Sequence, residues 1–243
     1  DRAVYFTTDS TFKGRAKNAL AAGEIEGALD KLKSQRFVAL LDCNFLGFDA
    51  GKEHAPDPNL SSFYREFLGN EEAKTPPSRV VFLANSGLKP SLNLKDHGVF
   101  AEAVIDGLSG KADSEGYEPD GNITVGELAK YVRKAVHELA LKHGDTDEMR
   151  AQMPVILEGQ ASDFIVERNP AVYPTAKKRL EAFAKIAKEK MLDKAITEEG
   201  THLLERMPKL ESQQSLRKAY QKLADGKLDV AGVEKERKDV LAS

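Results

Sequence analysis

An uncharged run of five residues, Phe37 to Leu41, constrains the fold of this chain more than any other stretch. It follows Gln35-Arg36 and ends abruptly in Asp42-Cys43-Asn44. A short apolar run with polar residues at both ends is typical of a buried strand in a parallel sheet. Ligands and catalytic groups of open α/β sheets collect beyond the carboxyl ends of such strands, so residues 42–47 are the first candidate site.

Short apolar runs alternate with stretches of helical spacing through the first two thirds of the chain. Arg79 to Leu83 and Phe164 to Val166 are predicted to be further strands of the same sheet. This alternation predicts a layered α/β domain over residues 1–168.

A helix is predicted over residues 125–142, and Thr124 and Glu127 have the spacing of a capping box at its start. The segment from Asp120 to Glu127 also imitates the second half of an EF-hand loop. The residues before it are unsuited to an entering helix, so we favour the capping box over a calcium site.

From Tyr173 onward every apolar pattern has helical spacing. Residues 169–243 carry a net charge of +4, whereas residues 1–168 carry −7. This asymmetry predicts a boundary near Asn169, followed by a helical hairpin or arm over 169–243 that packs on another domain or chain. Its basic residues are interleaved with acidic ones, which is typical of a solvated helix surface rather than a nucleic-acid interface.

The composition excludes several classes of protein. Of the 243 residues, 31% are charged and none is tryptophan, and no apolar run is long enough to span a membrane. We expect neither a membrane nor a nucleic acid as partner, and no cofactor or metal, because no phosphate-binding glycine pattern or metal-ligand spacing occurs. The single cysteine excludes an internal disulfide and leaves the compartment open, with the cytoplasm favoured.

Four motifs occur in an order that resembles the caspase-like cysteine peptidases, in particular the bacterial metacaspase and orthocaspase branch. They are Asp42 to Gly47, Arg79 to Asn85, Asp96 to Phe100, and Gly107 to Asp113. The resemblance covers roughly residues 1–168. It implies a three-layer caspase-like sandwich with a mostly parallel sheet, and a peptide or protein as substrate or ligand.

The resemblance fails at the nucleophile. The family motif is Asp-x-Cys-His-Ser-Gly, and Asp42 and Gly47 keep its spacing, so Asn44 occupies the nucleophile position and Cys43 the variable one. An amide cannot replace a thiolate as nucleophile, and neighbouring strand residues point to opposite faces. Cys43 is therefore either a small buried hydrophobe or, in a register shifted by one residue, a reactive thiol.

The family's catalytic histidine lies upstream of the nucleophile strand, and no histidine precedes Cys43 here. Because the chain also lacks an initiator methionine, we expect that it was cut from a longer protein whose upstream strand carries the base. His97 precedes Gly98 and is expected in the first turn of a helix, where the family has a structural His-Gly.

The predicted groove lies beyond the ends of the first two confident strands, at Asp42 and Asn85. In metacaspases an acidic pocket receives an arginine or lysine side chain, and Asp42 and Asp96 are the acids near strand ends here. The residues predicted to line the groove are Asp42, Cys43, Asn44, Ser86, Ser91 and His97.

Three functions remain open. The favoured one is a catalytically silent caspase-like domain that acts as a binding or regulatory module, because Asn44 occupies the nucleophile position. The second is an active cysteine endopeptidase that cleaves after basic residues, with Cys43 as nucleophile and an upstream histidine as base. The third is an unrelated α/β domain that binds a small ligand.

Overall fold

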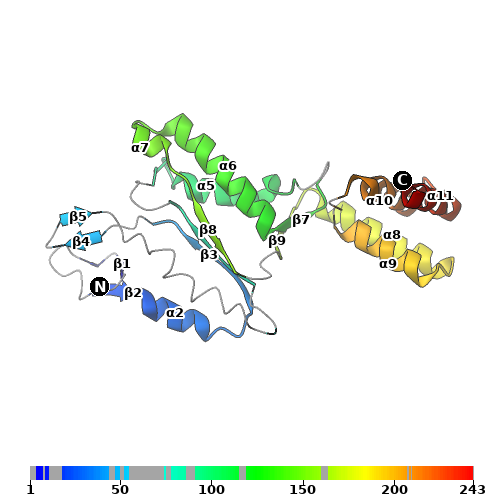
Figure 1. The fold of residues 1–243 in the computed structure, drawn as a ribbon, viewed down its shortest axis with the longest axis horizontal. Coiled ribbons are helices and arrows are strands. Elements are labelled where there is room, and N and C mark those ends of the chain that lie inside the picture. The colour runs from blue at the N-terminus through cyan, green and yellow to red at the C-terminus, as the bar shows by residue number, and fades with distance from the viewer. Residues whose placement is uncertain are drawn as a thin grey trace.

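The protein combines small sheets, which lie in its N-terminal part, with helices that extend to the C-terminus (Figure 1). Among the described helices, none is both long and apolar enough to cross a membrane. The computed structural model describes residues 4–7, 9–10, 18–43, 47–49, 52–54, 74, 78–85, 91–114, 119–159, 164–206, 208 and 210–242.

A three-stranded sheet with the order β3-β6-β8 forms the centre of the α/β part. Strands β3 (Arg36–Leu41) and β6 (Ser78–Leu83) pair in parallel, which confirms both predicted strands and their pairing. Strand β8 (Val155–Glu158) pairs with the other side of β6 and runs antiparallel. The prediction of a mostly parallel sheet is therefore wrong, since β3–β6 is the one parallel pairing among the described strands.

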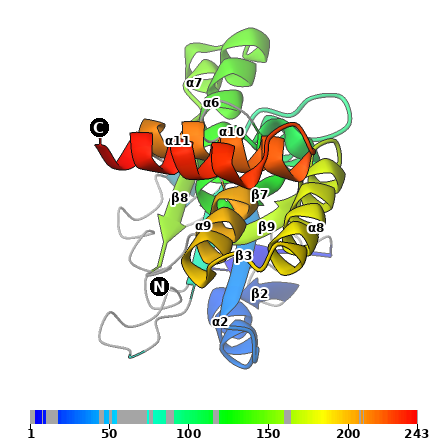
Figure 2. The same ribbon diagram turned by 90° about the vertical axis from the view of Figure 1, so that its right-hand side faces the viewer.

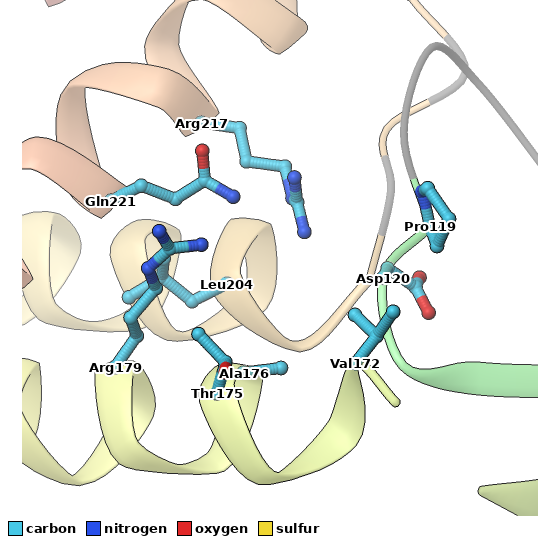
Figure 3. Close-up of a pocket in the computed structure, with 9 residues that line it drawn as sticks. All are labelled: Pro119, Asp120, Val172, Thr175, Ala176, Arg179, Leu204, Arg217 and Gln221. Atoms are coloured by element: carbon cyan, nitrogen blue, oxygen red, sulfur yellow. The ribbon is translucent and has the colours of Figure 1, made fainter. Parts of the chain in front are cut away.

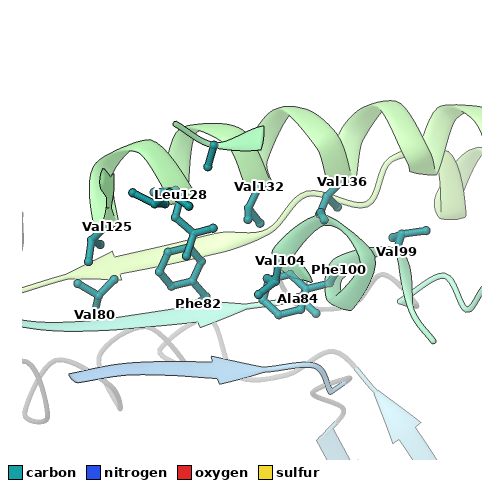
Figure 4. Packing of buried hydrophobic residues seen from close by; sticks show 14 of the residues in the cluster. Val80, Phe82, Ala84, Val99, Phe100, Val104, Val125, Leu128, Val132 and Val136 are labelled. Atoms are coloured by element: carbon teal, nitrogen blue, oxygen red, sulfur yellow. The ribbon is translucent and has the colours of Figure 1, made fainter. Parts of the chain in front are cut away.

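The main hydrophobic core lies between one face of β6 and two helices, α5 (Val99–Asp106) and α6 (Val125–His143) (Figure 4). Alternate strand residues share a face, so Val80, Phe82 and Ala84 all enter this core. Full burial contributes about 1.5–3 kcal/mol for each large apolar side chain. The helices add residues at helical spacing, namely Val99, Phe100, Ala103, Val104, Val125, Leu128, Val132 and Val136.

The antiparallel direction of β8 follows from these two helices. Val125, at the start of α6, lies over Val80, whereas Val136 lies near Val99 at the start of α5 (Figure 4). The chain therefore crosses the sheet once in α5 and again in α6, and it returns to the edge where β6 ended. A single crossover helix would have produced a parallel strand.

The opposite face of β6 is covered by α2 (Ala22–Asp30), which lies on the other side of the sheet from α5 and α6 (Figure 1). Leu29 of α2 packs against Val81 and Leu83. Helices therefore cover both faces of the central sheet. The neighbouring strands complete this second cluster with Phe37, Ala39, Leu41, Val155 and Leu157.

The start of α6 is capped as the sequence predicts. Thr124 Oγ1 accepts a hydrogen bond from the Glu127 amide at 3.2 Å, and the Glu127 carboxylate accepts one from the Thr124 amide at 2.8 Å. This reciprocal arrangement confirms the capping box. Helix α5, by contrast, begins at Val99 with Gly98 as its N-cap. His97 thus precedes the helix, and its predicted place in the first turn is wrong.

Strand β9 (Ile165–Arg168) pairs antiparallel with β7 (Asn122–Thr124), and these two strands form a separate sheet. Placing this segment in the central sheet was therefore wrong. The apolar residues of this segment predict a strand, but they do not specify with which other strand it pairs. Two more short strands, β4 (Gly47–Asp49) and β5 (Lys52–His54), pair antiparallel.

Short elements complete the α/β part. Strand β1 (Val4–Phe6) pairs antiparallel with β2 (Ala19–Ala21). A π-helix, η1 (Gly107–Lys111), continues α5, and the four-residue helix α7 (Asp147–Arg150) follows α6.

Four helices end the chain: α8 (Tyr173–Glu189), α9 (Lys194–Glu205), α10 (Glu211–Ala224) and α11 (Val230–Ala242). In Figure 2 these four helices face the viewer. They enclose a hydrophobic cluster of their own, in which the rings of Phe183 and Tyr220 meet edge to face with centroids 5.4 Å apart. Whether residues 169–243 form a separate domain stays a prediction.

Candidate functional site

The carboxyl ends of β3 and β6 lie side by side at one edge of the central sheet. The Ala84 amide donates to the Leu41 carbonyl at 3.0 Å, so the strands stay together past their last paired residues. Asp42 and Cys43 follow β3 directly, and Asn85 follows β6 at the same edge. The predicted groove requires this geometry, and binding at that edge stays a prediction.

The Asp42 carboxylate lies against the first turn of α5. It is hydrogen-bonded by the backbone amide of Ala101, and a Cβ atom placed on Gly98 would lie 2.9 Å from its Oδ2. A helix N-terminus attracts carboxylates through its unpaired amides and its dipole. Burial nevertheless raises the pKa of Asp42, although the Ala101 amide and the charge of His97 oppose the shift.

His97 lies beside Asp42, immediately before the N-cap of α5. Its Nε2 is 3.2 Å from Glu102 Oε2, and its carbonyl accepts a hydrogen bond from the Leu94 amide at 2.8 Å. Its buried Nδ1 has no hydrogen-bond partner among the described residues. The structural role of His97 stays a prediction, and its charge also acts on the Asp42 carboxylate.

The thiol of Cys43 is half-buried and directly follows the acid Asp42. Burial, and secondarily the negative charge of Asp42, raise the pKa of Cys43 to about 11. At pH 7 only about one thiol in ten thousand would then be ionised. A nucleophilic cysteine needs the opposite surroundings, a nearby cation or helix N-terminus that lowers its pKa.

Gln152 holds the segment after β6 against the sheet, a role that the sequence did not predict. Its Nε2 donates to the Ala84 carbonyl at 3.0 Å, and its Oε1 accepts from the Leu92 amide at 2.7 Å. The side chain is completely buried, so both bonds satisfy groups that water does not reach. The available signal was a Gln-x-Pro pattern just before an apolar strand.

The structure thus brings part of the predicted groove together. Asp42, Cys43 and His97 lie at the carboxyl edge of the sheet, and half-buried Ser91 precedes the Leu92 that Gln152 holds. Asn44 and Ser86 lie outside the described residues, so their contribution stays a prediction. Within the described ranges, no group of three His, Cys, Asp or Glu side chains could hold a metal ion.

Comparisons with protein-family models, curated proteins and solved structures find no match to this chain. The caspase-like resemblance therefore stays a prediction from sequence motifs.

Proposed function

We propose that this chain is a caspase-like domain without peptidase activity, which binds a polypeptide at the carboxyl edge of β3 and β6. The observation that carries the proposal is the position of Cys43, which is half-buried and directly follows the acid Asp42. Burial and this negative charge raise the pKa of the thiol to about 11, the opposite of what a nucleophilic cysteine needs. The asparagine at the family's nucleophile position, Asn44, supports the same conclusion.

The layering of the α/β part supports the caspase-like sandwich within this proposal. Helix α2 covers one face of the central sheet, and α5 and α6 cover the other. The active-peptidase alternative is disfavoured, because the acid next to Cys43 works against ionisation of its thiol.

A binding role fits the polar groups at this edge. Parallel strands that end side by side commonly present their following residues to a ligand, and here these residues include Asp42 and Cys43. The carboxylate of Asp42 favours a segment that carries an arginine or lysine side chain. Binding of such a segment needs no ionised thiol and is therefore compatible with the state of Cys43.

Thiol reactivity tests the inactive state. The rate of Cys43 alkylation by iodoacetamide should rise with pH toward a midpoint near 11, where the pKa of the thiol lies. Asp42→Asn should move this midpoint to lower pH, because it removes a nearby negative charge. Asp239→Asn, at an exposed position of α11, is the matched control and should leave the midpoint unchanged. A midpoint near neutral pH would overturn the proposal.

Peptide assays test the binding role. Neither the protein nor its Cys43→Ala variant should cleave fluorogenic peptides that contain Arg or Lys, with or without calcium. Cleavage that disappears in Cys43→Ala would make Cys43 a nucleophile. A library of Arg- and Lys-containing peptides should bind, and Asp42→Asn should weaken binding at least tenfold, while Asp239→Asn at an exposed position of α11 does not. Equal binding by both variants would exclude Asp42 from the site.

A further inference from the structure

One ring nitrogen of His97, beside the proposed binding edge, is not used by the fold. Its Nδ1 is buried and has no hydrogen-bond partner among the described residues. We propose that His97 takes up a proton at this nitrogen as the pH falls, and that the new positive charge weakens binding of a basic polypeptide segment at Asp42. This regulation rests on the proposed function, because it acts at the same edge of the sheet.

The other ring nitrogen decides where the proton of the neutral ring lies. Nε2 is 3.2 Å from Glu102 Oε2, and a carboxylate oxygen only accepts hydrogen bonds, so Nε2 carries the proton. Nδ1 is then the acceptor nitrogen, and a second proton binds there. Histidine side chains ordinarily gain or lose this second proton roughly between pH 5 and pH 8.

Two carboxylates face the ring from different elements. Glu102 lies in the first turn of α5, and Asp42 follows β3, where the charge of His97 acts on it. Lys95 and Asp96 precede the histidine, and both are exposed and opposite in charge. The two carboxylates therefore attract the second proton, whereas burial of Nδ1 opposes it.

The added charge changes what the edge attracts. With a neutral ring, the carboxylates of Asp42 and Glu102 give this edge two negative charges. Protonation of His97 cancels one of them and places a cation beside the carboxylate that would hold the ligand. An arginine or lysine side chain at Asp42 is then attracted less strongly, and the affinity should fall about fivefold.

The charged groups around a cavity elsewhere in the molecule are, by contrast, already paired. This cavity of about 170 Å³ lies between the segment before β7 and helices α8, α9 and α10 (Figure 3). Arg179 is paired with Asp225 at 2.9 Å and 3.0 Å, and Arg217 donates to the Leu203 carbonyl at 3.0 Å. The fold satisfies these groups, whereas it leaves Nδ1 of His97 without a partner within the described part of the chain.

Peptide binding at two pH values tests the proposal. The probe is an end-capped peptide with one arginine as its sole charged group, so its own charge does not change with pH. The unmodified 243-residue chain should bind it about fivefold more weakly at pH 5.5 than at pH 8. His97→Gln should lose most of this difference, and the remainder measures protonation of Asp42. An equal difference in both proteins would overturn the proposal.

The matched control is His143→Gln, at the exposed last residue of α6, which should keep the full pH dependence. The same loss of pH dependence in His143→Gln would overturn the assignment to His97. No binding by the unmodified chain at pH 8 would instead overturn the proposed function itself, so the two failures are distinguishable.

A measurement without peptide covers the case that His97→Gln does not fold. In nitrogen-15 NMR spectra of the unmodified chain, the ring of His97 should carry a proton on Nε2 alone at pH 8 and on both nitrogens at pH 5.5. Glu102→Gln should move this change to lower pH, because it removes one of the two attracting charges. A ring that gains no second proton by pH 5.5 would overturn the proposal.

Discussion

The α/β core and the C-terminal helical cluster of this molecule are held together by different kinds of contact. In the α/β core, β6 lies between β3 and β8, which are far from it in the sequence, and Gln152 ties the strand end to a distant segment. In the helical cluster, the contacts join helices that are close in the sequence: α8 with α9 and α10, α9 with α10, and α10 with α11. The first region therefore depends on long-range pairing, and the second on local spacing and close packing.

The largest expected effect comes from removing the centre of the α/β core. Phe82→Ala deletes a fully buried ring between the sheet and the helices, and should lower the free energy of unfolding by about 3–5 kcal/mol. Leu40→Ala, at a position on β3 that is 42% exposed, is the control and should cost less than about 1 kcal/mol. Urea denaturation measures both. A loss below about 1 kcal/mol in Phe82→Ala would mean that this core tolerates the cavity.

The next largest loss of stability is expected when the buried hydrogen bonds of Gln152 are removed. Gln152→Leu leaves the Ala84 carbonyl and the Leu92 amide without their partner inside the fold. Each unsatisfied buried group costs about 1–3 kcal/mol, so we expect a total loss of about 2–4 kcal/mol. Exposed Gln213→Leu on α10 is the matched control and should change stability by less than about 0.5 kcal/mol. Equal stability of both variants in urea would exclude this role for Gln152.

Close packing in the helical cluster can be tested at Gly200 on α9. A Cβ there would lie 2.4 Å from the Phe183 ring and 2.6 Å from that of Tyr220. Gly200→Ala should therefore destabilise the protein by about 1–3 kcal/mol, although alanine favours helices.

The control for this prediction lies in the other region. Among the described residues, no side chain and no backbone atom outside α2 lies within 4 Å of the Cβ position of Gly27 on α2, so Gly27→Ala should stabilise by about 0.5–1 kcal/mol. Thermal denaturation of the two variants should give shifts of opposite sign. A stabilising Gly200→Ala would show that the rings can move apart.

The smallest effect is electrostatic. The hydrogen bonds from Arg179 hold the pKa of Asp225 below its ordinary value. The pair therefore contributes stability above the unfolded-state pKa of aspartate, and this contribution is lost as pH falls through the folded-state pKa. Between pH 5 and pH 3 the melting temperature of Asp225→Asn should fall less than that of the unmodified protein. Exposed Asp239→Asn should follow the unmodified protein, and an equal fall in all three would contradict this assignment.

Local patterns predicted much of the fold. The apolar runs identified β3 and β6, and the spacing of Thr124 and Glu127 identified the start of α6. Helical spacing was predicted from Tyr173 onward, where α8, α9, α10 and α11 lie. Three apolar residues of this region, Met191, Leu210 and Leu241, are nevertheless exposed. The spacing of apolar residues alone does not show where a helix ends or which of its apolar residues a neighbouring helix covers.

The sequence alone placed Asp42 and His97 near one sheet edge, because residues after parallel strands share that edge. It could not reveal the approach of Asp42 to Gly98 or the two bonds of Gln152. These contacts join segments that are distant in the chain. No local pattern encodes their distance.

The sequence by itself determined that β3, β6 and β9 are strands and that Thr124 caps α6, because the spacing of apolar residues and the caps act over a few neighbouring residues. Only the tertiary structure decided the direction of β8, the partner of β9 and the surroundings that raise the pKa of Cys43. The direction of a strand depends on how many helices cross the sheet before it. The pKa of a thiol depends on its burial and on nearby charges, which exist only once distant segments have packed together.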